Sequence, residues 1–536
     1  MIRNPILPGF NPDPSICRVG DDYYIATSTF EWFPGVQIHH SRDLVNWTLV
    51  RRPVERASQL DMRGNPDSCG VWAPCLSYAD GLFWLVYTDV KRFDGSFKDA
   101  NNYIITSPTI EGEWSDPVYV NSSGFDPSLF HDDDGRKWFV NMQWNHRPET
   151  FGGSPNSPHF DGILLQEWDP QTKSLKGPIT NIFPGTDRGL VEAPHLFKRG
   201  GWYYLTTAEG GTGYDHAVTM ARARNIAGPY ELHPNKYLMT TKDHPESPLQ
   251  RVGHGQYVET PDGQVYHTYL CGRPLAPQRR CTLGRETGIA RCVWKEDGWL
   301  YLENGTLVPD VEVEGLGGAT PVEKPWRSGD NFDGAALPLD FQWLRTPEPQ
   351  RIFSVTERPG HLRLFARQSI GSWFEQALVA RRQEHHRFRA ETAVDFAPDT
   401  YQQVAGLTHY YNRYKFHAIG VTLHETLGRC VTILSCPGNF PDGSLVFPVG
   451  SGVAVPEGRI QLAMEVRDND LQFFWQAEGM GAWQPIGPVL DAGVVSDEGG
   501  RGEHGSFTGA FAGMFAFDTS GRAKPADFDW FNYDRL

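Results

Sequence analysis

The sequence predicts an all-β protein, with a five-bladed β-propeller followed by a β-sandwich of the jelly-roll type. Three observations lead to this prediction. Aromatic, alternating segments recur about 60 residues apart through the first part of the chain. A chain of 536 residues exceeds what one hydrophobic core normally supports. A Gly- and Pro-bearing connector, GLGGATPVEKPWRSGD (315–330), separates the two parts.

The recurring segments follow Asp-Gly or similar turns and are expected to be strands. They are DDYYIATST (21–29), DGLFWLVYTD (80–89), DDGRKWFVNMQW (133–144), RGGWYYLTTAEG (199–210) and DGQVYHTYLCG (262–272). Alternation and aromatic content favour β structure over helix. Five four-stranded blades then fill residues 1–313, a linker spans 314–328, and short β runs such as KFHAIGVTL (415–423) build a sandwich over 329–536.

The composition excludes several classes of partner. The formal charge of -16 and pI near 5.6 lack the positive surface that nucleic acid or an anionic membrane requires. No apolar stretch approaches the length of a membrane span, and the N-terminus lacks a signal pattern, so a cytoplasmic protein is expected. The eight cysteines form no CxxC pair and are interpreted as reduced, mostly buried side chains.

Upstream of each aromatic strand lies a polar or aromatic residue, usually followed by proline and a small or polar residue. These residues are Asp13, Trp72, Asp126, Glu192 and His254. They occupy corresponding places in successive repeats, which radial symmetry maps onto one ring around the channel axis. We therefore expect three carboxylates, a tryptophan and a histidine to converge at one mouth of the channel.

Such a ring is equipped for glycoside hydrolysis. Separated carboxyls in unlike environments supply a protonated acid for the leaving oxygen and an ionised base or nucleophile. A cross-axis separation of Asp13 and Glu192 leaves room for water and favours inversion, while Asp126 approaches Glu192 and raises its pKa. The alternative is that the acids cap turns or bind a structural cation. His254 has three interpretations, which are bonding substrate, binding a divalent ion and plugging the channel, and Trp72 is either a core residue or a stacking surface for sugar.

The ordered motifs resemble glycoside hydrolase family 43, specifically its two-domain β-xylosidases. The motifs that carry the resemblance are NPDPSI (11–16), STFEWFPGVQIHHSRDLVNW (28–47), GVWAPCL (70–76), GFDPSLF (124–130), GLVEAPHLF (189–197), GHGQYV (253–258), LGRETG (283–288), SFTGAFAGMFAFD (506–518) and ADFDWFNY (526–533). The resemblance implies a five-bladed propeller with a concanavalin-like sandwich. It also implies that Asp13 is the general base, Asp126 the pKa modulator and orienter, and Glu192 the general acid.

The same resemblance assigns the substrate pocket. It implies that Arg285 contacts the terminal sugar and the acid, with His254 nearby, and that Phe30, Trp72 and Trp144 wall the pocket. A phenylalanine of the second domain closes one side, which we place at Phe507 with Phe511 as the alternative. A closed pocket admits only a chain end.

The resulting hypothesis is an exo-acting, inverting hydrolase that releases D-xylose from the non-reducing ends of 1,4-β-xylo-oligosaccharides, with side activity on α-L-arabinofuranosides. The alternatives are an enzyme that is mainly an α-L-arabinofuranosidase, a retaining fructoside-cleaving enzyme and a non-catalytic sugar-binding propeller. No cofactor is expected to be required, although a divalent cation such as Ca²⁺ near the propeller axis, with His254 as a ligand, stays an alternative. Related enzymes suggest a homo-oligomer, either a tetramer or a dimer.

Overall fold

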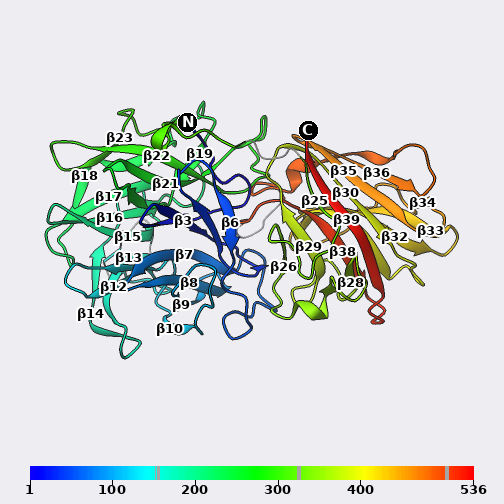
Figure 1. Cartoon of the computed structure of the whole chain (residues 1–536), viewed down its shortest axis with the longest axis horizontal. Helices are drawn as coiled ribbons and strands as arrows, with labels where there is room; N and C mark the ends of the chain where they lie inside the picture. Colours follow the sequence, from blue (N-terminus) through cyan, green and yellow to red (C-terminus); the bar gives the residue numbers. More distant parts are fainter. Residues whose placement is uncertain (151, 154–156, 158, 323–326, 501–505) are drawn as a thin grey trace.

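The computed structural model describes residues 1–150, 152–153, 157, 159–322, 327–500 and 506–536. Figure 1 shows two bodies side by side, the first part of the chain in blue to green and the second in yellow to red. Apart from short 3₁₀ turns, the regular structure of these ranges is all strand, which confirms the predicted all-β class. No helix within the described ranges is long and apolar enough to cross a membrane.

The first body consists of five consecutive antiparallel sheets, whose strands pair in chain order except at the start of the fifth, where the first two strands both pair with the third. The sheets are β2 (Ser15–Val19), β3 (Asp22–Thr27), β5 (Gln37–Ser41) and β6 (Thr48–Arg51); β7 (Gly70–Ala79), β8 (Leu82–Arg92), β9 (Asp99–Ser107) and β10 (Val118–Asn121); β11 (Ser128–His131), β12 (Lys137–Trp144), β13 (Phe160–Asp169) and β14 (Ser174–Phe183); β15 (Glu192–Arg199), β16 (Trp202–Glu209), β17 (Ala217–Ala223) and β18 (Glu231–Thr240); and β19 (Gln250–Gly253) with β20 (Tyr257–Glu259), β21 (Val265–Gly272), β22 (Glu286–Trp294) and β23 (Leu300–Leu302). First strands lie beside first strands, β2 against β7, β7 against β11 and β11 against β15, so they surround the axis of the predicted five-bladed propeller.

Local sequence explains how the blades turn. Gly81 follows Asp80 between β7 and β8 and has φ of 74°, a left-handed conformation that glycine adopts without steric cost. Phe83 and Trp84, which follow it in β8, lie in two different buried clusters, because successive side chains of a strand point to opposite faces of the sheet. The two ends of the ring meet where β1 (Ile2–Arg3) pairs with β24 (Glu312–Val313), so the N-terminal strand closes the propeller.

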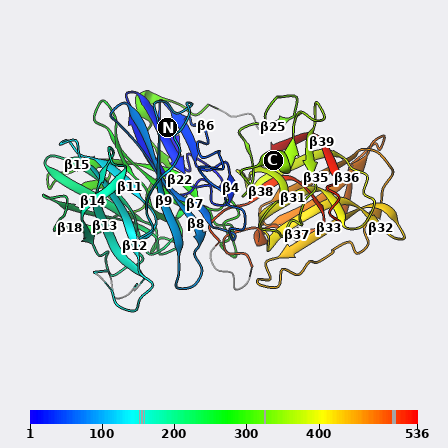
Figure 2. The same cartoon turned by 90° about the horizontal axis from the view of Figure 1, so that it is seen from below.

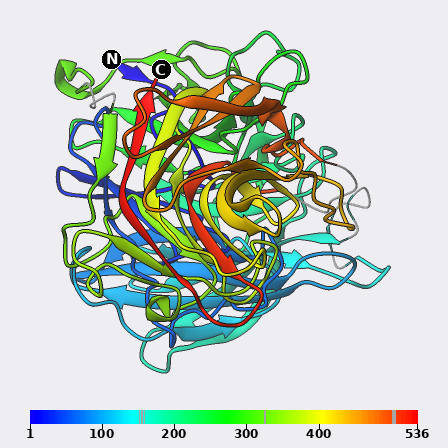
Figure 3. The same cartoon turned by 90° about the vertical axis from the view of Figure 1, so that its right-hand side faces the viewer.

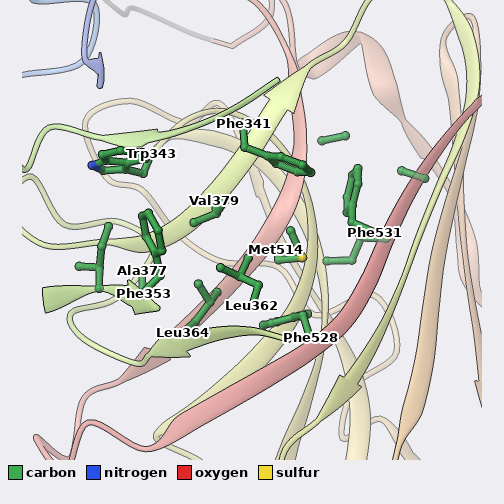
Figure 4. Close-up of a cluster of buried hydrophobic side chains, with 14 of the residues drawn as sticks. Phe341, Trp343, Phe353, Leu362, Leu364, Ala377, Val379, Met514, Phe528 and Phe531 are labelled. Atoms are coloured by element: carbon green, nitrogen blue, oxygen red, sulfur yellow. The ribbon is translucent and has the colours of Figure 1, made fainter. Parts of the chain in front are cut away.

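The second body is a sandwich of two antiparallel sheets. One sheet runs β27 (Phe353–Ser354), β28 (Leu362–Phe365), β39 (Pro525–Arg535), β30 (Arg387–Asp395), β35 (Ile460–Arg467), β36 (Asp470–Ala477) and β37 (Gln484–Asp491), with β25 (Arg327–Asp330) paired to β39. The other runs β34 (Val453–Ala454), β33 (Gly428–Pro437), β32 (Lys415–His424), β31 (Gln403–Asn412), β38 (Phe511–Asp518), β29 (Ala377–Arg382), β26 (Phe341–Leu344) and β4 (Trp32–Phe33). Figure 3 views these curved sheets from their own end. Figure 4 shows side chains such as Met514 and Phe528 interleaved between them, as the face-to-face packing of two sheets requires.

One edge strand of the sandwich comes from the propeller part of the chain. Strand β4 leaves the first sheet between β3 and β5 and pairs with β26, with Trp32 opposite Leu344 and Phe33 opposite Trp343. The Trp32 ring stacks on Phe511 with centroids 3.7 Å apart, and both side chains are fully buried. Figure 2 places β4 at the boundary between the two bodies. The sandwich sheet therefore includes residues far outside the predicted range 329–536, and two buried apolar clusters each contain side chains of both domains.

Candidate active site

Each blade has a residue with a left-handed backbone in its first strand or close to it. These residues are Asp13 (φ 58°), Ala73 (φ 35°), Asp126 (φ 53°), Ala193 (φ 52°) and His254 (φ 45°). Such a conformation outside glycine costs on the order of 1–3 kcal/mol and persists only where the surroundings impose it. Its recurrence at one place in all five repeats marks a backbone shape that the fold maintains at the mouth of the channel.

This recurrence corrects the register of the expected ring. Asp13, Asp126 and His254 occupy the left-handed position itself, whereas Trp72 and Glu192 lie one residue before it. Trp72 pairs with Thr88 and Glu192 pairs with Ala208, and in both strands the register shifts immediately afterwards. The physical reason is an alanine between the functional residue and the proline. The resulting bulge turns side chains at both positions toward the same mouth.

A cavity of about 110 Å³ opens at this place. Its lining brings together nearly all of the residues singled out from the sequence and several others. The lining residues are Asp13, Phe30, Trp72, Phe93, Lys98, Phe125, Asp126, Phe160, Glu192, Thr212, His254, Arg285 and Phe507. The three acids are 5, 7 and 8 % exposed in chain order, so each is buried against the cavity and not solvated at the surface.

Asp13 is fixed through both carboxyl oxygens. Ser28 Oγ donates to Oδ2 at 2.6 Å, and Arg285 Nη1 donates to Oδ1 at 3.1 Å. The Ser28 hydroxyl is itself held, because the Ala73 N–H of the next blade donates to its oxygen at 2.7 Å. His254 Nδ1 lies 3.5 Å from Oδ1. Asp13 is therefore oriented by its own blade, by the next blade and by the last blade, as a preorganised catalytic group requires.

Glu192 and Asp126 are in a different environment from Asp13. Burial, and then the charge of Asp13, raise the pKa of Glu192 to about 8, against the opposing charges of Arg285 and Lys98. Burial, and then the charges of Glu192 and Asp13, raise the pKa of Asp126 well above its ordinary value. The charge of Glu192 acts on Asp126, so the two carboxyls lie close to each other. A proton is consequently held on this pair at neutral pH, which a general acid needs.

His254 is a neutral side chain of the cavity wall. Burial, and then the charge of Arg285, lower the pKa of His254 to about 3. Within the described ranges, no group of three or more His, Cys, Asp or Glu side chains is arranged to hold a metal ion. Calcium prefers six to eight oxygen ligands, a need that an imidazole does not meet. Of the three interpretations of His254, its position beside Asp13 on the cavity favours a hydrogen bond to substrate.

Three aromatic rings from three parts of the chain enclose the cavity. Phe30 lies 5.8 Å from Trp72, and Phe507 lies 5.9 Å from Trp72 and 6.3 Å from Phe30, measured between ring centroids. The Trp72 indole N–H donates to the Ser68 carbonyl at 2.9 Å, which fixes the ring plane. Flat apolar faces of this kind suit the C–H faces of a sugar.

Trp144 lies one layer farther out than expected. It is not among the residues that line the cavity. It packs behind them instead, 5.4 Å from Phe160 and 6.4 Å from Phe125 between ring centroids, and its indole N–H donates to the Ser96 carbonyl. No sequence pattern distinguishes this outer position from the inner one, because Trp144 is the last residue of β12.

Several lining residues had no signal that singled them out. Lys98 lies in the segment between β8 and β9, where its ammonium group is 4.2 Å from the Trp144 ring centroid and donates to the Phe93 carbonyl. Phe93 belongs to the same segment, Phe160 begins β13 and Thr212 follows β16. Only Phe125 stood next to a recognised motif residue, Asp126, and could have been found from the register of the repeat.

The sandwich closes the cavity with Phe507. Arg285 Nη2 donates to the Phe507 carbonyl at 2.9 Å, and the Phe507 N–H donates to Ser68 Oγ at 3.2 Å. Both hydrogen bonds cross from the propeller to the sandwich. The alternative residue, Phe511, lies on β38 and stacks against Trp32 in the interior, away from the cavity lining.

A propeller mouth with three buried carboxyls in unlike environments, walled by aromatic rings, defines a glycoside-cleaving enzyme. Residues 2–300 match the profile of glycosyl hydrolases family 43, and residues 329–534 match the beta xylosidase C-terminal concanavalin A-like domain. The chain belongs to glycosyl hydrolase family 43.

Similar proteins cover the whole chain. It is 60% identical over 536 residues to a protein named xylosidase/arabinosidase 43B from Humicola insolens, an alignment that covers 99% of this chain and 97% of that protein. It is 48% identical to the beta-xylosidase of Bacillus subtilis strain 168, with 99% of each chain covered. The crystal structure of xylan beta-1,4-xylosidase from Bacillus halodurans C-125 superposes with a TM-score of 0.95 at 49% identity and covers 100% of both chains.

Proposed function

We propose that this enzyme is an exo-acting, inverting β-xylosidase that releases D-xylose from the non-reducing ends of 1,4-β-xylo-oligosaccharides. The observation that carries the proposal is the contrast between two carboxyls of one cavity. Asp13 accepts hydrogen bonds at both oxygens, whereas burial and the Asp13 charge raise the pKa of Glu192 to about 8. One group is oriented to accept a proton and the other holds one.

The reaction follows from these positions. Asp13 removes a proton from a water molecule, which attacks the anomeric carbon, while Glu192 donates its proton to the leaving glycosidic oxygen. We assign Asp126 the role of orienting Glu192, because the charge of Glu192 acts on Asp126. The charge that raises the pKa of Glu192 is that of Asp13 and not that of Asp126. Arg285 and the neutral His254 supply hydrogen bonds to the hydroxyls of the terminal sugar, and Phe30, Trp72 and Phe507 cover its apolar surfaces.

The closed side of the cavity supports exo action. Phe507 is tied to the propeller through Arg285 and Ser68, so the sandwich blocks one end of the site. A chain end fits such a site, whereas the middle of a polysaccharide needs an open groove. The names of the similar proteins, beta-xylosidase and xylan beta-1,4-xylosidase, support xylose as the sugar and the 1,4 linkage.

A second substrate is supported by one of the similar proteins. The Humicola insolens protein is named xylosidase/arabinosidase, so α-L-arabinofuranosides are proposed as an additional substrate. An α-L-arabinofuranose has an outline similar to that of xylose in a small pocket. A chain that is mainly an arabinofuranosidase is the alternative.

We further propose a cytoplasmic location, no required cofactor and a homo-oligomer, either a tetramer or a dimer. All eight cysteines are free and buried, which suits a reducing compartment. The acid and base chemistry above needs only the carboxyls of the chain. The neighbouring side chains of Leu445, Val446 and Phe447 are between 42 and 49 % exposed, an apolar surface that a second copy would cover. Light scattering after gel filtration tests this assembly.

Rates on two classes of substrate test the assignment of acid and base. The 4-nitrophenolate ion leaves without protonation, whereas the sugar leaving group of xylobiose needs the acid. Glu192→Gln should therefore lose about 100-fold to 10,000-fold on xylobiose and much less on 4-nitrophenyl β-D-xyloside, while Asp13→Asn should lose on both. Equal losses for the two variants on both substrates would contradict the roles, and a faster wild-type rate on the α-L-arabinofuranoside would favour the alternative substrate.

A further inference from the structure

A second cavity, of about 220 Å³, lies between the first blade and the sandwich. It is separate from the active site, and none of its lining residues is shared with that cavity. Its volume is far above the roughly 10–15 Å³ that one water molecule needs, and its walls are more polar than apolar. The cavity therefore has room for a small polar ligand.

Two buried arginines line this cavity, one from each domain. Arg52 follows β6 of the propeller and is 4 % exposed, and Arg382 ends β29 of the sandwich and is 5 % exposed. Their side chains are bonded to neutral acceptors. Arg52 donates to Gln37 Oε1 and to the carbonyls of Leu339 and Phe341, and Arg382 donates to the Phe10 carbonyl and to Gln342 Oε1.

Neither guanidinium has a carboxylate partner. Across the described part of the chain, no Asp or Glu oxygen lies within 4.0 Å of Arg52 or Arg382, and the Nη2 atom of Arg382 is buried with no hydrogen-bond acceptor. Buried charges without a partner are costly, because burial removes their hydration. Accordingly, burial lowers the pKa of Arg52 to about 9, and burial together with the charge of Arg52 lowers that of Arg382 well below its ordinary value.

The remaining charged groups of the lining offset this pair only in part. The charge of Asp340 raises the pKa of Arg52, and the charges of Glu384 and Asp340 raise that of Arg382, but each effect is smaller than that of burial. Asp340 and Glu384 lie nearest to Arg381, at 3.8 Å and 3.6 Å between oxygen and nitrogen atoms. Asp340 is largely exposed, so water screens it. The lining therefore holds three arginines against two carboxylates, with the carboxylates gathered at Arg381.

We propose that this cavity binds a small oxyanion of the phosphate or carboxylate kind, held between Arg52 of the propeller and Arg382 of the sandwich. Guanidinium groups present paired N–H donors that match the oxygens of such anions. The bound anion neutralises two like charges that face each other across the domain boundary. It binds the folded chain and not the unfolded one, so it stabilises the docking of the two domains.

The test is thermal unfolding of the full chain while inorganic phosphate, and separately acetate, replaces chloride at constant ionic strength. We expect the midpoint to rise by a few degrees and to saturate with at least one of the two anions. The anion whose effect on the midpoint saturates at the lower concentration shows whether the cavity prefers a phosphate or a carboxylate group. A midpoint that responds to neither anion more than to chloride would overturn the proposal.

Amino-acid substitutions test whether the anion response arises in this cavity. Arg52→Met should abolish the anion response, and Arg387→Met, at an exposed site paired with Asp468, should keep it. Thr48→Glu places a tethered carboxylate in the lining at an exposed position and should also abolish the response, whereas Thr48→Gln should keep it. If Arg52→Met does not fold, the comparison of Thr48→Glu with Thr48→Gln still tests whether the anion binds in this cavity. A response that persists in Thr48→Glu would place the anion elsewhere and refute this site.

Discussion

Arg285 connects Asp13 to the opposite domain. One amino group of its guanidinium donates to Asp13 Oδ1 at 3.1 Å, and the other donates to the Phe507 carbonyl at 2.9 Å. The Arg285 side chain is 3 % exposed. A single rigid fork thus sets the position of the proposed base relative to the aromatic ring that closes the cavity, which ties catalysis to the docking of the sandwich.

Replacing Arg285 with lysine should separate these two functions. Lysine keeps the positive charge but lacks the planar fork, so it can reach Asp13 or Phe507 but not both. We expect kcat/KM on xylobiose to fall about 100-fold, a loss of the size seen when one preorganised donor is removed. Circular dichroism verifies that the variant folds. Wild-type kinetics in Arg285→Lys would show that only the charge matters.

The pH dependence of kcat/KM should follow the proton on Glu192. Burial and the Asp13 charge raise the pKa of Glu192 to about 8, so the acid is present below that pH and is lost as the pH rises through it. The alkaline limb of the activity profile should therefore lie near pH 8. A limb near the ordinary carboxyl value of about 4.3 would refute the assignment.

Phe507 and Phe511 should have opposite phenotypes although only four positions separate them. Phe507→Ala opens the cavity and should raise KM for xylobiose about tenfold, equivalent to ~1.4 kcal/mol, with little change in the unfolding midpoint. Phe511→Ala removes a buried ring that stacks on Trp32, so it should cost about 3–5 kcal/mol of stability. Steady-state kinetics and urea unfolding measure the two effects. An unchanged KM in Phe507→Ala would remove Phe507 from the substrate site.

Removal of divalent cations should leave the reaction unchanged. Asp13 and Glu192 supply the base and the acid, so dialysis against a chelator should preserve kcat on xylobiose. The unfolding midpoint, recorded on the same samples, reports any structural ion. A loss of activity that added Ca²⁺ restores would establish a metal dependence and would return His254 to the list of candidate ligands.

The domain boundary contains a buried ionic cluster whose removal should destabilise the protein. Arg345 is fully buried, and its Nη2 donates to Asp67 at 2.7 Å. Burial raises the pKa of Glu31 to about 8, which the charge of Arg345 counteracts. Arg345→Met leaves these carboxyls without that cation and should cost about 3–5 kcal/mol in urea unfolding. Arg42→Met, in an exposed ion pair with Asp22, is the control and should cost less than about 1 kcal/mol. Equal costs would contradict the account of this boundary.

The repeated part of the site could be predicted because the fold repeats it. Asp13, Asp126 and His254 occupy the same backbone position in their repeats, and in each motif a proline or glycine follows the residue. Lys98 and Phe160 lie in or beside connections whose lengths differ from blade to blade, so no periodicity marks them. The placement of Phe507 came from resemblance to a family and not from periodicity or composition.

The link between the domains lay beyond sequence reasoning for a different reason. Strand β4 contains only Trp32 and Phe33, and a two-residue strand has no alternation to detect. Its partner Leu344 is more than 300 positions away. Packing of the two bodies, not local propensity, makes it a strand.

The stereochemistry of the first product tests the central claim most directly. Proton NMR during rapid turnover of a β-xyloside distinguishes the two anomers of xylose before they equilibrate. Attack by a water that Asp13 activates, on the face opposite the leaving group, predicts that the α anomer appears first. Initial release of the β anomer would show a covalent intermediate and would contradict the roles assigned to Asp13 and Glu192.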